Sequence, residues 1–190
     1  MQLGSLTSIF TGLKYNSKNI NAEQASVFLI QGKDIQNNLL NKDNLFKLDR
    51  YCVDKYQYLK SGDVLFAAKG NRNFAFHYNG ELGEVAASST FFIIRITSEN
   101  VLPEYLSWYL NSKPAQDFFK ANTHGTFIPS IPKSKLIELK IPITDLKTQK
   151  TIALIENQQM LERELLKQIS TKRTLLINEI IHNKILRKND

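Results

Sequence analysis

"HGTFIPSIPKSKLIELKIPI", residues 124–143, divides the chain into two parts of different character. The stretch holds three prolines, and its second half, 135–143, alternates apolar and polar residues in the way that predicts a β-strand. From 146 to 187 the sequence then has neither proline nor glycine. These features predict that a compact body ends here and that one long helix follows it.

The predicted helix carries an apolar seam. Leu161, Leu165, Ile169, Leu176 and Ile180 recur at steps of four, four, seven and four, close to a coiled-coil repeat. About 40 helical residues extend roughly 60 Å, whereas a body of about 145 residues is some 35 to 40 Å across. The apolar seam would therefore project beyond the body and need a partner. Two like helices could pack antiparallel as a symmetric dimer, and a partner protein with a matching groove would serve equally well.

A helical hairpin folded back on the body is the alternative for this segment. Its turn would fall near Asn157 or Ser170. Neither position carries a turn-forming glycine or proline, which favours the single helix.

The sequence pattern of residues 1–145 predicts an α+β body. Segments rich in β-branched and aromatic residues predict strands at 25–31, 63–69, 73–78, 90–96 and 135–143. Between the last two, 103–122 repeats apolar residues at helical spacing, with Pro103 in a first turn and Pro114 separating two helices. We expect a mixed, curved or barrel-like sheet with small helices.

Composition narrows the class of protein. The 190 residues are 42% hydrophobic and 23% charged, as in globular proteins, and no run approaches the ~20 apolar residues of a membrane span. The first residues lack the features of a secretory signal, so a cytoplasmic protein is expected. The lone Cys52 is interpreted as a small packing residue. A net charge of +7 permits a polyanionic partner.

Five segments together resemble the specificity (S) subunit of type I restriction-modification enzymes. In order, they are "LGSLTSIFTGLKY" (3–15), "SGDVLFAAKGN" (61–71), "STFFIIRITSENVLPEYLSWYLNS" (89–112), "GTFIPSIPKSKLIELKIPI" (125–143) and "QKTIALIE" (149–156). Their order and spacing are similar to the repeat unit of that family, a target recognition domain followed by a long helix. The resemblance covers nearly the whole chain.

This resemblance implies a half-length S subunit. Members of the family carry two recognition domains and two long helices, which pair antiparallel and set the distance between two DNA half-sites. Residues 1–145 would be one DNA target recognition domain and residues 146–190 one dimerisation and spacer helix. The implied partners are double-stranded DNA, a second copy or another half subunit, a modification (methyltransferase) subunit and, through it, a restriction subunit.

Side chains suited to DNA cluster in three predicted loops. Cations contact phosphates, while arginine and asparagine make paired hydrogen bonds to guanine and adenine. The candidates are Lys14, Tyr15, Asn16 and Lys18; Lys69, Asn71, Arg72, Asn73, His77 and Tyr78; and His124 and Thr126. Composition alone favours solvated loops and hydrogen-bonded histidines, and the resemblance favours DNA contacts.

Catalysis by the chain alone is not expected. Asp117, Glu138 and Lys140 imitate the acidic pair and lysine of metal-dependent nucleases, but an alternating strand would place Glu138 and Lys140 on its solvent face. The sequence has no phosphate-cradling loop, no methyltransferase motif and no histidine spacing typical of metal ligands, so neither cofactor nor metal is predicted. An oligomerising interaction protein that does not bind DNA remains the other candidate.

Overall fold

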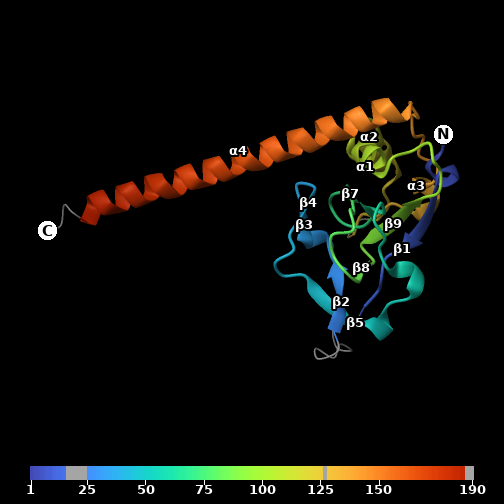
Figure 1. Cartoon of the computed structure of the whole chain (residues 1–190), viewed down its shortest axis with the longest axis horizontal. Helices are drawn as coiled ribbons and strands as arrows, with labels where there is room; N and C mark the ends of the chain where they lie inside the picture. The colour runs from blue at the N-terminus through green and yellow to red at the C-terminus, as the bar shows by residue number, and fades with distance from the viewer. Residues whose placement is uncertain (16–24, 126–127, 187–190) are drawn as a thin grey trace. The chain divides into compact units, whose positions relative to one another are not determined.

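The computed structural model describes residues 1–15, 25–125 and 128–186, with side chains up to residue 184 (Figure 1). Candidates Asn16, Lys18 and Thr126 lie outside the described residues. The chain forms two compact units, Met1–Ala153 and Leu154–Asp190. The first unit is called the body below.

The described elements follow in chain order. They are η1 (Leu3–Ser5), β1 (Thr7–Thr11), β2 (Ala25–Ile30), η3 (Gly32–Asp34), β3 (Ile35–Gln36), β4 (Leu39–Leu40), β5 (Phe46–Asp49), η4 (Arg50–Cys52), η5 (Lys55–Gln57), β6 (Val64–Ala67), β7 (Ala75–His77), β8 (Val85–Ala87), β9 (Phe91–Ile96), α1 (Pro103–Asn111), α2 (Lys113–Asn122), α3 (Lys133–Leu136) and α4 (Leu146–Leu186).

The main sheet has the strand order β1-β9-β6-β7, and every neighbouring pair in it is antiparallel. Thr11 pairs with Phe92, Ala67 pairs with Phe91, and Phe66 pairs with Ala75. The end of β1, the end of β6, the start of β7 and the start of β9 therefore lie at one end of this sheet. We call it the loop end.

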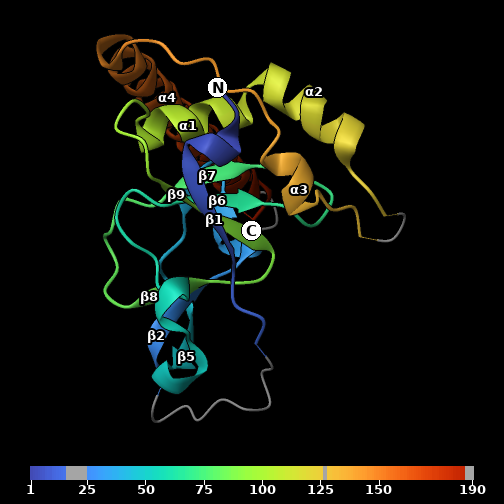
Figure 2. The same ribbon diagram turned by 90° about the vertical axis from the view of Figure 1, so that its right-hand side faces the viewer.

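Both faces of the central strands are buried. Along β6, Val64 and Phe66 belong to one apolar core, and Leu65 and Ala67 belong to a second. Helices α1 and α2 cover the face of the main sheet that carries Val64 and Phe66, and the smaller sheet of β2, β5 and β8 lies on the opposite side (Figure 2). Burial on both faces explains why this strand reads as an unbroken apolar run.

A buried ion pair joins the start of β6 to β9. The Arg95 guanidinium donates to both carboxylate oxygens of Asp63, at 2.8 and 2.7 Å, and also to the carbonyl of Tyr58. Asp63 is 1% exposed, so its charge needs this partner. Hydrogen bonding to Asp63 raises the pKa of Arg95.

The predicted α+β class and the long C-terminal helix are confirmed. The described strands are distributed over small sheets of four, three and two strands. Pro103 and Pro114 lie in the first turns of α1 and α2, as predicted. The interpretation of Cys52 as a small packing residue is wrong: it is an exposed thiol at the end of the short 3-10 turn η4, which has no buried residue.

The predicted strand at 135–143 is wrong. After Pro132 the chain makes the single helical turn α3, and residues 137–141 then run alongside the N-terminus. The N–H groups of Leu3 and Gly4 donate to the carbonyls of Leu139 and Ile137, at 2.8 and 3.0 Å. The apolar spacing that suggested alternation combines one helical turn with one extended segment.

Helix α4 begins where the sequence changes character. Asp145 accepts hydrogen bonds from the N–H and hydroxyl of Thr148, at 2.9 and 2.6 Å, and so caps the first turn. These bonds lower the pKa of Asp145. The helix continues without a break through Asn157 and Ser170, which excludes the hairpin alternative.

Gln149 attaches the first turns of α4 to the rest of the body. Its side chain is fully buried, and its amide nitrogen donates to the carbonyls of Asn100 and Thr144, each at 2.8 Å. Its amide oxygen accepts from the N–H of Leu102 at 2.9 Å, just before α1 begins. One glutamine thus joins three segments and has all its polar atoms satisfied.

In the second unit, every described residue of α4 is exposed or half-buried. The predicted seam residues, Leu161, Leu165, Ile169, Leu176 and Ile180, are each 47–59% exposed. Among the described helices, none is long and apolar enough to cross a bilayer.

Replacing Gln149 by leucine is expected to lower the free energy of unfolding by about 2 kcal/mol, because two carbonyls and one N–H around a buried side chain lose their partners. Urea unfolding followed by the fluorescence of the single tryptophan, Trp108 in α1, measures this. Gln168→Leu on the exposed part of α4 is the matched control and should leave the transition unchanged. Equal transitions for both variants would contradict the anchoring role of Gln149.

Candidate nucleic-acid interface

The first predicted loop starts at the loop end of the main sheet, where residues 12–15 follow β1. Leu13 donates its N–H to Ala87 at 2.7 Å, and its carbonyl accepts from Ser89 at 2.8 Å. A Cβ on Gly12 would lie 2.2 Å from the carbonyl oxygen of Ser88, so only glycine permits this close approach. Lys14 is exposed and Tyr15 half-buried at this place.

The second loop, 68–74, connects β6 to β7 at the same end. Its Ala68 donates to the carbonyl of Thr90 at 3.0 Å, beside the segment that the first loop contacts. Gly70 has a φ of +114°, a conformation that favours glycine, and it leads to the exposed Asn71 and Arg72.

The third loop follows α2 and returns beside the second. Ile131 donates to the carbonyl of Ala68, and Lys69 forms a β-bridge with Ser130. His124 and Ser130 exchange backbone hydrogen bonds of 2.9 and 2.8 Å. The described parts of the three predicted loops are therefore joined through the turn at 88–90 and through Ser130. We call this joined region the loop surface.

The loop surface is basic. Lys14, Lys69 and Arg72 are exposed, and within the described residues none of the three pairs with a carboxylate. Arg72 lies over the ring of Phe74, with its guanidinium carbon 5.8 Å from the ring centroid. A planar cation steadied by an aromatic ring keeps its hydrogen-bonding edges available to a ligand.

Asn73 has a structural function. Its amide nitrogen donates to the carbonyl of Ala67 at 2.9 Å and so closes the loop that displays Asn71 and Arg72. Its side chain therefore shapes the surface from inside the loop.

His77 lies away from the loop surface. It pairs with Val64 at the opposite end of β7 and faces Glu104 of α1 at 3.8 Å. Burial lowers the pKa of His77, and the carboxylate of Glu104 opposes this shift. His77 is half-buried and faces α1, so its position does not support the predicted contact with DNA.

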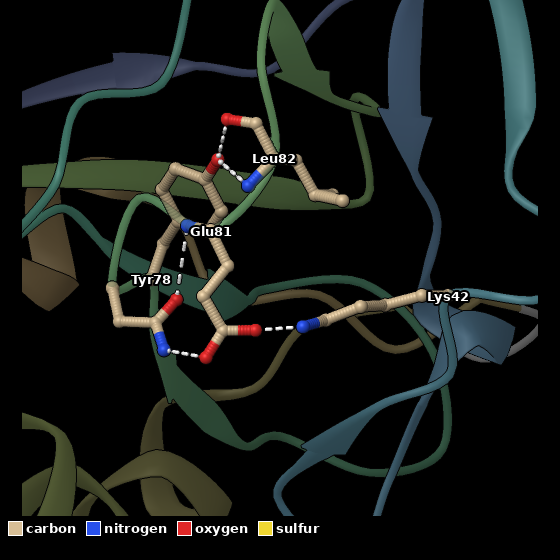
Figure 3. A network of polar contacts seen from close by, with 5 residues as sticks. Lys42, Tyr78, Glu81 and Leu82 are labelled. Atoms are coloured by element: carbon tan, nitrogen blue, oxygen red, sulfur yellow. Dashed lines mark hydrogen bonds and ion pairs between the residues drawn. The ribbon is translucent and has the colours of Figure 1, made fainter.

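The prediction that Tyr78 contacts DNA is wrong. Its side chain is 2% exposed in the second core. Its hydroxyl donates to the carbonyl of Leu82 and accepts from the N–H of the same residue, at 2.9 and 3.2 Å (Figure 3). Figure 3 also shows the ion pair that Lys42, from the segment between β4 and β5, makes with Glu81 of this loop. The sequence placed Tyr78 beside candidates in a neighbouring loop without revealing that its side chain points inward.

Both acids of the nuclease-like set make local ion pairs. Asp117 pairs with Lys113 within α2, and Glu138, in the turn after α3, pairs with Lys135, both at 2.9 Å. Hydrogen bonding to Lys113 lowers the pKa of Asp117. Among the described residues, no three His, Cys, Asp or Glu side chains gather in the manner of a metal site.

Sequence reasoning missed one lysine near the loop surface. Lys33 in η3 is exposed and lines a cleft together with Lys14, Tyr15 and the turn at 88–90. The sequence around Lys33 gives no sign that it lies near the other loops. It does so because β2, which leads into η3, pairs in parallel with β8, which precedes the turn at 88–90.

Three solved structures from type I restriction-modification (R-M) systems have a similar fold. A chain from work on complex assembly and conformational transition of the type I R-M system aligns with a TM-score of 0.63 and 18% identity over 90% of this chain. The S subunit from M. genitalium aligns with a TM-score of 0.58 and 17% identity over 90%. The HsdS subunit from Thermoanaerobacter tengcongensis aligns with a TM-score of 0.58 and 19% identity over 88%.

The chain thus has the fold of type I S subunits, as the resemblance in its sequence predicted. It spans 38–40% of the length of these solved chains. No protein-family model matches the sequence, and no curated protein does.

Arg72→Ala is expected to relax the choice of one base by about tenfold or more, since a bidentate contact discriminates by about 1–3 kcal/mol. Selection of duplexes from a randomised pool by the full chain, followed by sequencing, measures this. Arg72→Lys is the matched control: it keeps the charge but loses the paired donors, so it should retain affinity and still lose selectivity. An unchanged preference in both variants would remove Arg72 from base reading.

Proposed function

We propose that this chain is a sequence-specific DNA-binding specificity subunit of a type I R-M system, in half-length form, which reads one half-site of a bipartite target. One observation carries the proposal. In a chain with the S-subunit fold over 90% of its residues, the described parts of three loops, which carry Lys14, the Lys69, Asn71 and Arg72 group, and His124, meet at one end of the main sheet. Convergence of such loops is what DNA readout requires, because base edges and neighbouring phosphates must be contacted together.

The described candidate residues suit different groups of the DNA. Lys14, Lys69 and His124 are exposed and suit phosphates, and Asn71 and Arg72 suit base edges in the major groove. Tyr15 is half-buried against Phe46, with ring centroids 5.6 Å apart, so its hydroxyl end is the part that could reach a ligand. Asn16, Lys18 and Thr126 remain candidates on sequence grounds alone.

Helix α4 would supply the contacts between subunits. Its exposed seam, Leu161, Leu165, Ile169, Leu176 and Ile180, fits a second copy packed antiparallel, which would produce two identical readers and a palindromic bipartite target. A modification (methyltransferase) subunit and, through it, a restriction subunit would join this assembly in the cytoplasm. Methylation and cleavage would then belong to those partners, and this chain would perform no chemistry.

A second candidate is an interaction protein that oligomerises through α4 without reading DNA. The exposed apolar residues of α4 favour it, since they require a partner of some kind. It leaves the basic loop surface without a function. Salt-dependent binding of duplex DNA separates the two candidates, because neutralised phosphates release counterions.

Mapping methylated bases across the genome of the source strain, with and without this gene, tests the specificity function. We expect a bipartite methylated motif to disappear on deletion and to return on complementation. Complementation with the Arg72→Ala variant should restore methylation at an altered motif. An unchanged methylation pattern in the deletion strain would favour the interaction protein.

The double variant Leu165→Asp, Leu176→Asp is expected to be monomeric at concentrations where the parent chain dimerises, because two buried charges would face an apolar partner. Sedimentation equilibrium measures the mass. Thr171→Asp with Thr174→Asp is the matched control, because at 3.6 residues per turn these positions lie across the helix from the seam. The same mass for the parent and the leucine double variant would show that copies meet elsewhere.

A further inference from the structure

A cleft of about 360 Å³ lies at the edge of the loop surface. Its walls come from three segments: residues 14–15 after β1, residues 31–33 at η3, and the turn 88–90 between β8 and β9. The lining residues that matter here are Lys14, Tyr15, Lys33, Ser88, Ser89 and Thr90. The size is near the lower end for small-ligand pockets, so the cleft has room for a phosphate group.

Ser88 is the unusual member of this set. The residue is 6% exposed, and its hydroxyl oxygen is buried without a hydrogen-bond partner in the described structure. Leaving a buried hydroxyl unpaired costs about 1–3 kcal/mol. Because Ser88 is one of the residues that line the cleft, we take its unpaired hydroxyl as a candidate donor to an anion bound there.

The walls of the cleft carry positive charge. Lys14 and Lys33 approach from separate segments, and neither is paired with a carboxylate among the described residues. The nearest acid in sequence, Asp34, is buried and accepts the N–H of Gln31 at 2.8 Å, so its carboxylate is turned into the backbone of η3. Two lysines together with the hydroxyl groups of Tyr15, Ser88, Ser89 and Thr90 form a donor set for an anion.

The cleft is held in place by the sheets on either side. Ser88 donates its N–H to the carbonyl of Ile30 at 2.9 Å, and its carbonyl accepts from Phe91 at 2.9 Å. Gln31 and Asp34 cap each other around η3 and fix the backbone that carries Lys33. Because these hydrogen bonds already order the backbone of the cleft, binding a ligand there costs less conformational entropy.

The cleft is also continuous with the loop surface. The carbonyl of Thr90, on its wall, accepts from Ala68, and the next residue, Lys69, begins the second loop. A DNA strand whose bases face Asn71 and Arg72 would carry its phosphates past such a neighbouring site. An anion site beside the reading loops positions a duplex without reading its sequence.

We propose that this cleft is a clamp for one phosphate of the DNA backbone, with Lys33 and Lys14 supplying charge and Ser88 and its neighbours supplying hydroxyl donors. This inference rests on the proposed function, since it assumes that the loop surface meets DNA. It adds Lys33 and Ser88 to the residues that bind. A free phosphate or a nucleotide would offer the same chemistry, so the test separates these sources.

The test measures the affinity of the full chain for a labelled duplex of random sequence between 50 and 200 mM salt, by fluorescence anisotropy. With Lys33→Gln we expect the slope of log K against log salt to fall by about 0.9, with a similar loss of affinity on every sequence. Ser88→Ala should weaken binding severalfold with the slope unchanged, because serine carries no charge. Lys113→Gln in α2, which also removes one exposed lysine, is the matched control and should bind as the parent does.

A second readout follows the backbone amide resonances of residues 88–90 by NMR. We expect them to shift on adding duplex DNA to the parent chain and to shift much less in Lys33→Gln, while inorganic phosphate alone acts only at millimolar concentrations. Loss of stability in Ser88→Ala is checked by its urea transition. Lys33→Gln keeps the test decisive if Ser88→Ala does not fold.

The outcomes separate this inference from the function on which it rests. If the parent chain binds DNA and Lys33→Gln behaves like Lys113→Gln, the clamp is wrong and the reading function stands. If the parent chain binds no duplex at any salt, both are wrong. If residues 88–90 respond to inorganic phosphate but not to DNA, the cleft is a site for a free phosphate and the clamp is overturned.

Discussion

Burial of β6 on both of its faces is the constraint on which the rest of the body depends. Val64 and Phe66 are enclosed by the helices, and Leu65 and Ala67 by the smaller sheet. A one-residue slip would exchange these two sets and force each into the wrong core, so the pairing with β9 has one register. That register places the end of β6 and the start of β9 together, and β1 and β7 follow by their own pairings. The loop end of the sheet is a consequence of core packing.

The loop surface is held in place by its attachment to this sheet. The described parts of its loops are each tied by backbone hydrogen bonds to a strand end, to the turn at 88–90 or to a neighbouring loop. Glycine is needed at two of these ties, at Gly12 for close approach and at Gly70 for a left-handed φ. The charged side chains consequently stand on a supported backbone and remain exposed. At the start of α4, the side chain of Gln149 likewise ties the helix to the body by its hydrogen bonds to Asn100, Leu102 and Thr144.

Much of the fold could be predicted from local pattern, and much less of the site. The apolar runs of β6 and β9 and the prolines in the first turns of α1 and α2 indicated the right elements. Arg72 and Lys69 could be proposed from the sequence because glycine and asparagine mark their loop. The sequence did not reveal that the side chain of Tyr78 points into the core. Lys33 was not among the sequence candidates, because its place near the loop surface depends on the parallel pairing of β2 with β8, which are far apart in sequence.

The sequence by itself determined the helical character of α4, its apolar seam, the position where it begins and the α+β character of the body. These depend on residues within one or two turns of each other, so short-range periodicity and capping suffice. Tertiary structure alone decided that the loops meet, that residues 135–143 make one turn and then follow the N-terminus, and that Ser88 lies unpaired at a basic cleft. Each of these depends on pairings between segments distant in sequence, such as Ala67 with Phe91 and Leu3 with Leu139. Such pairings form only when the whole body packs, so no local pattern reveals them.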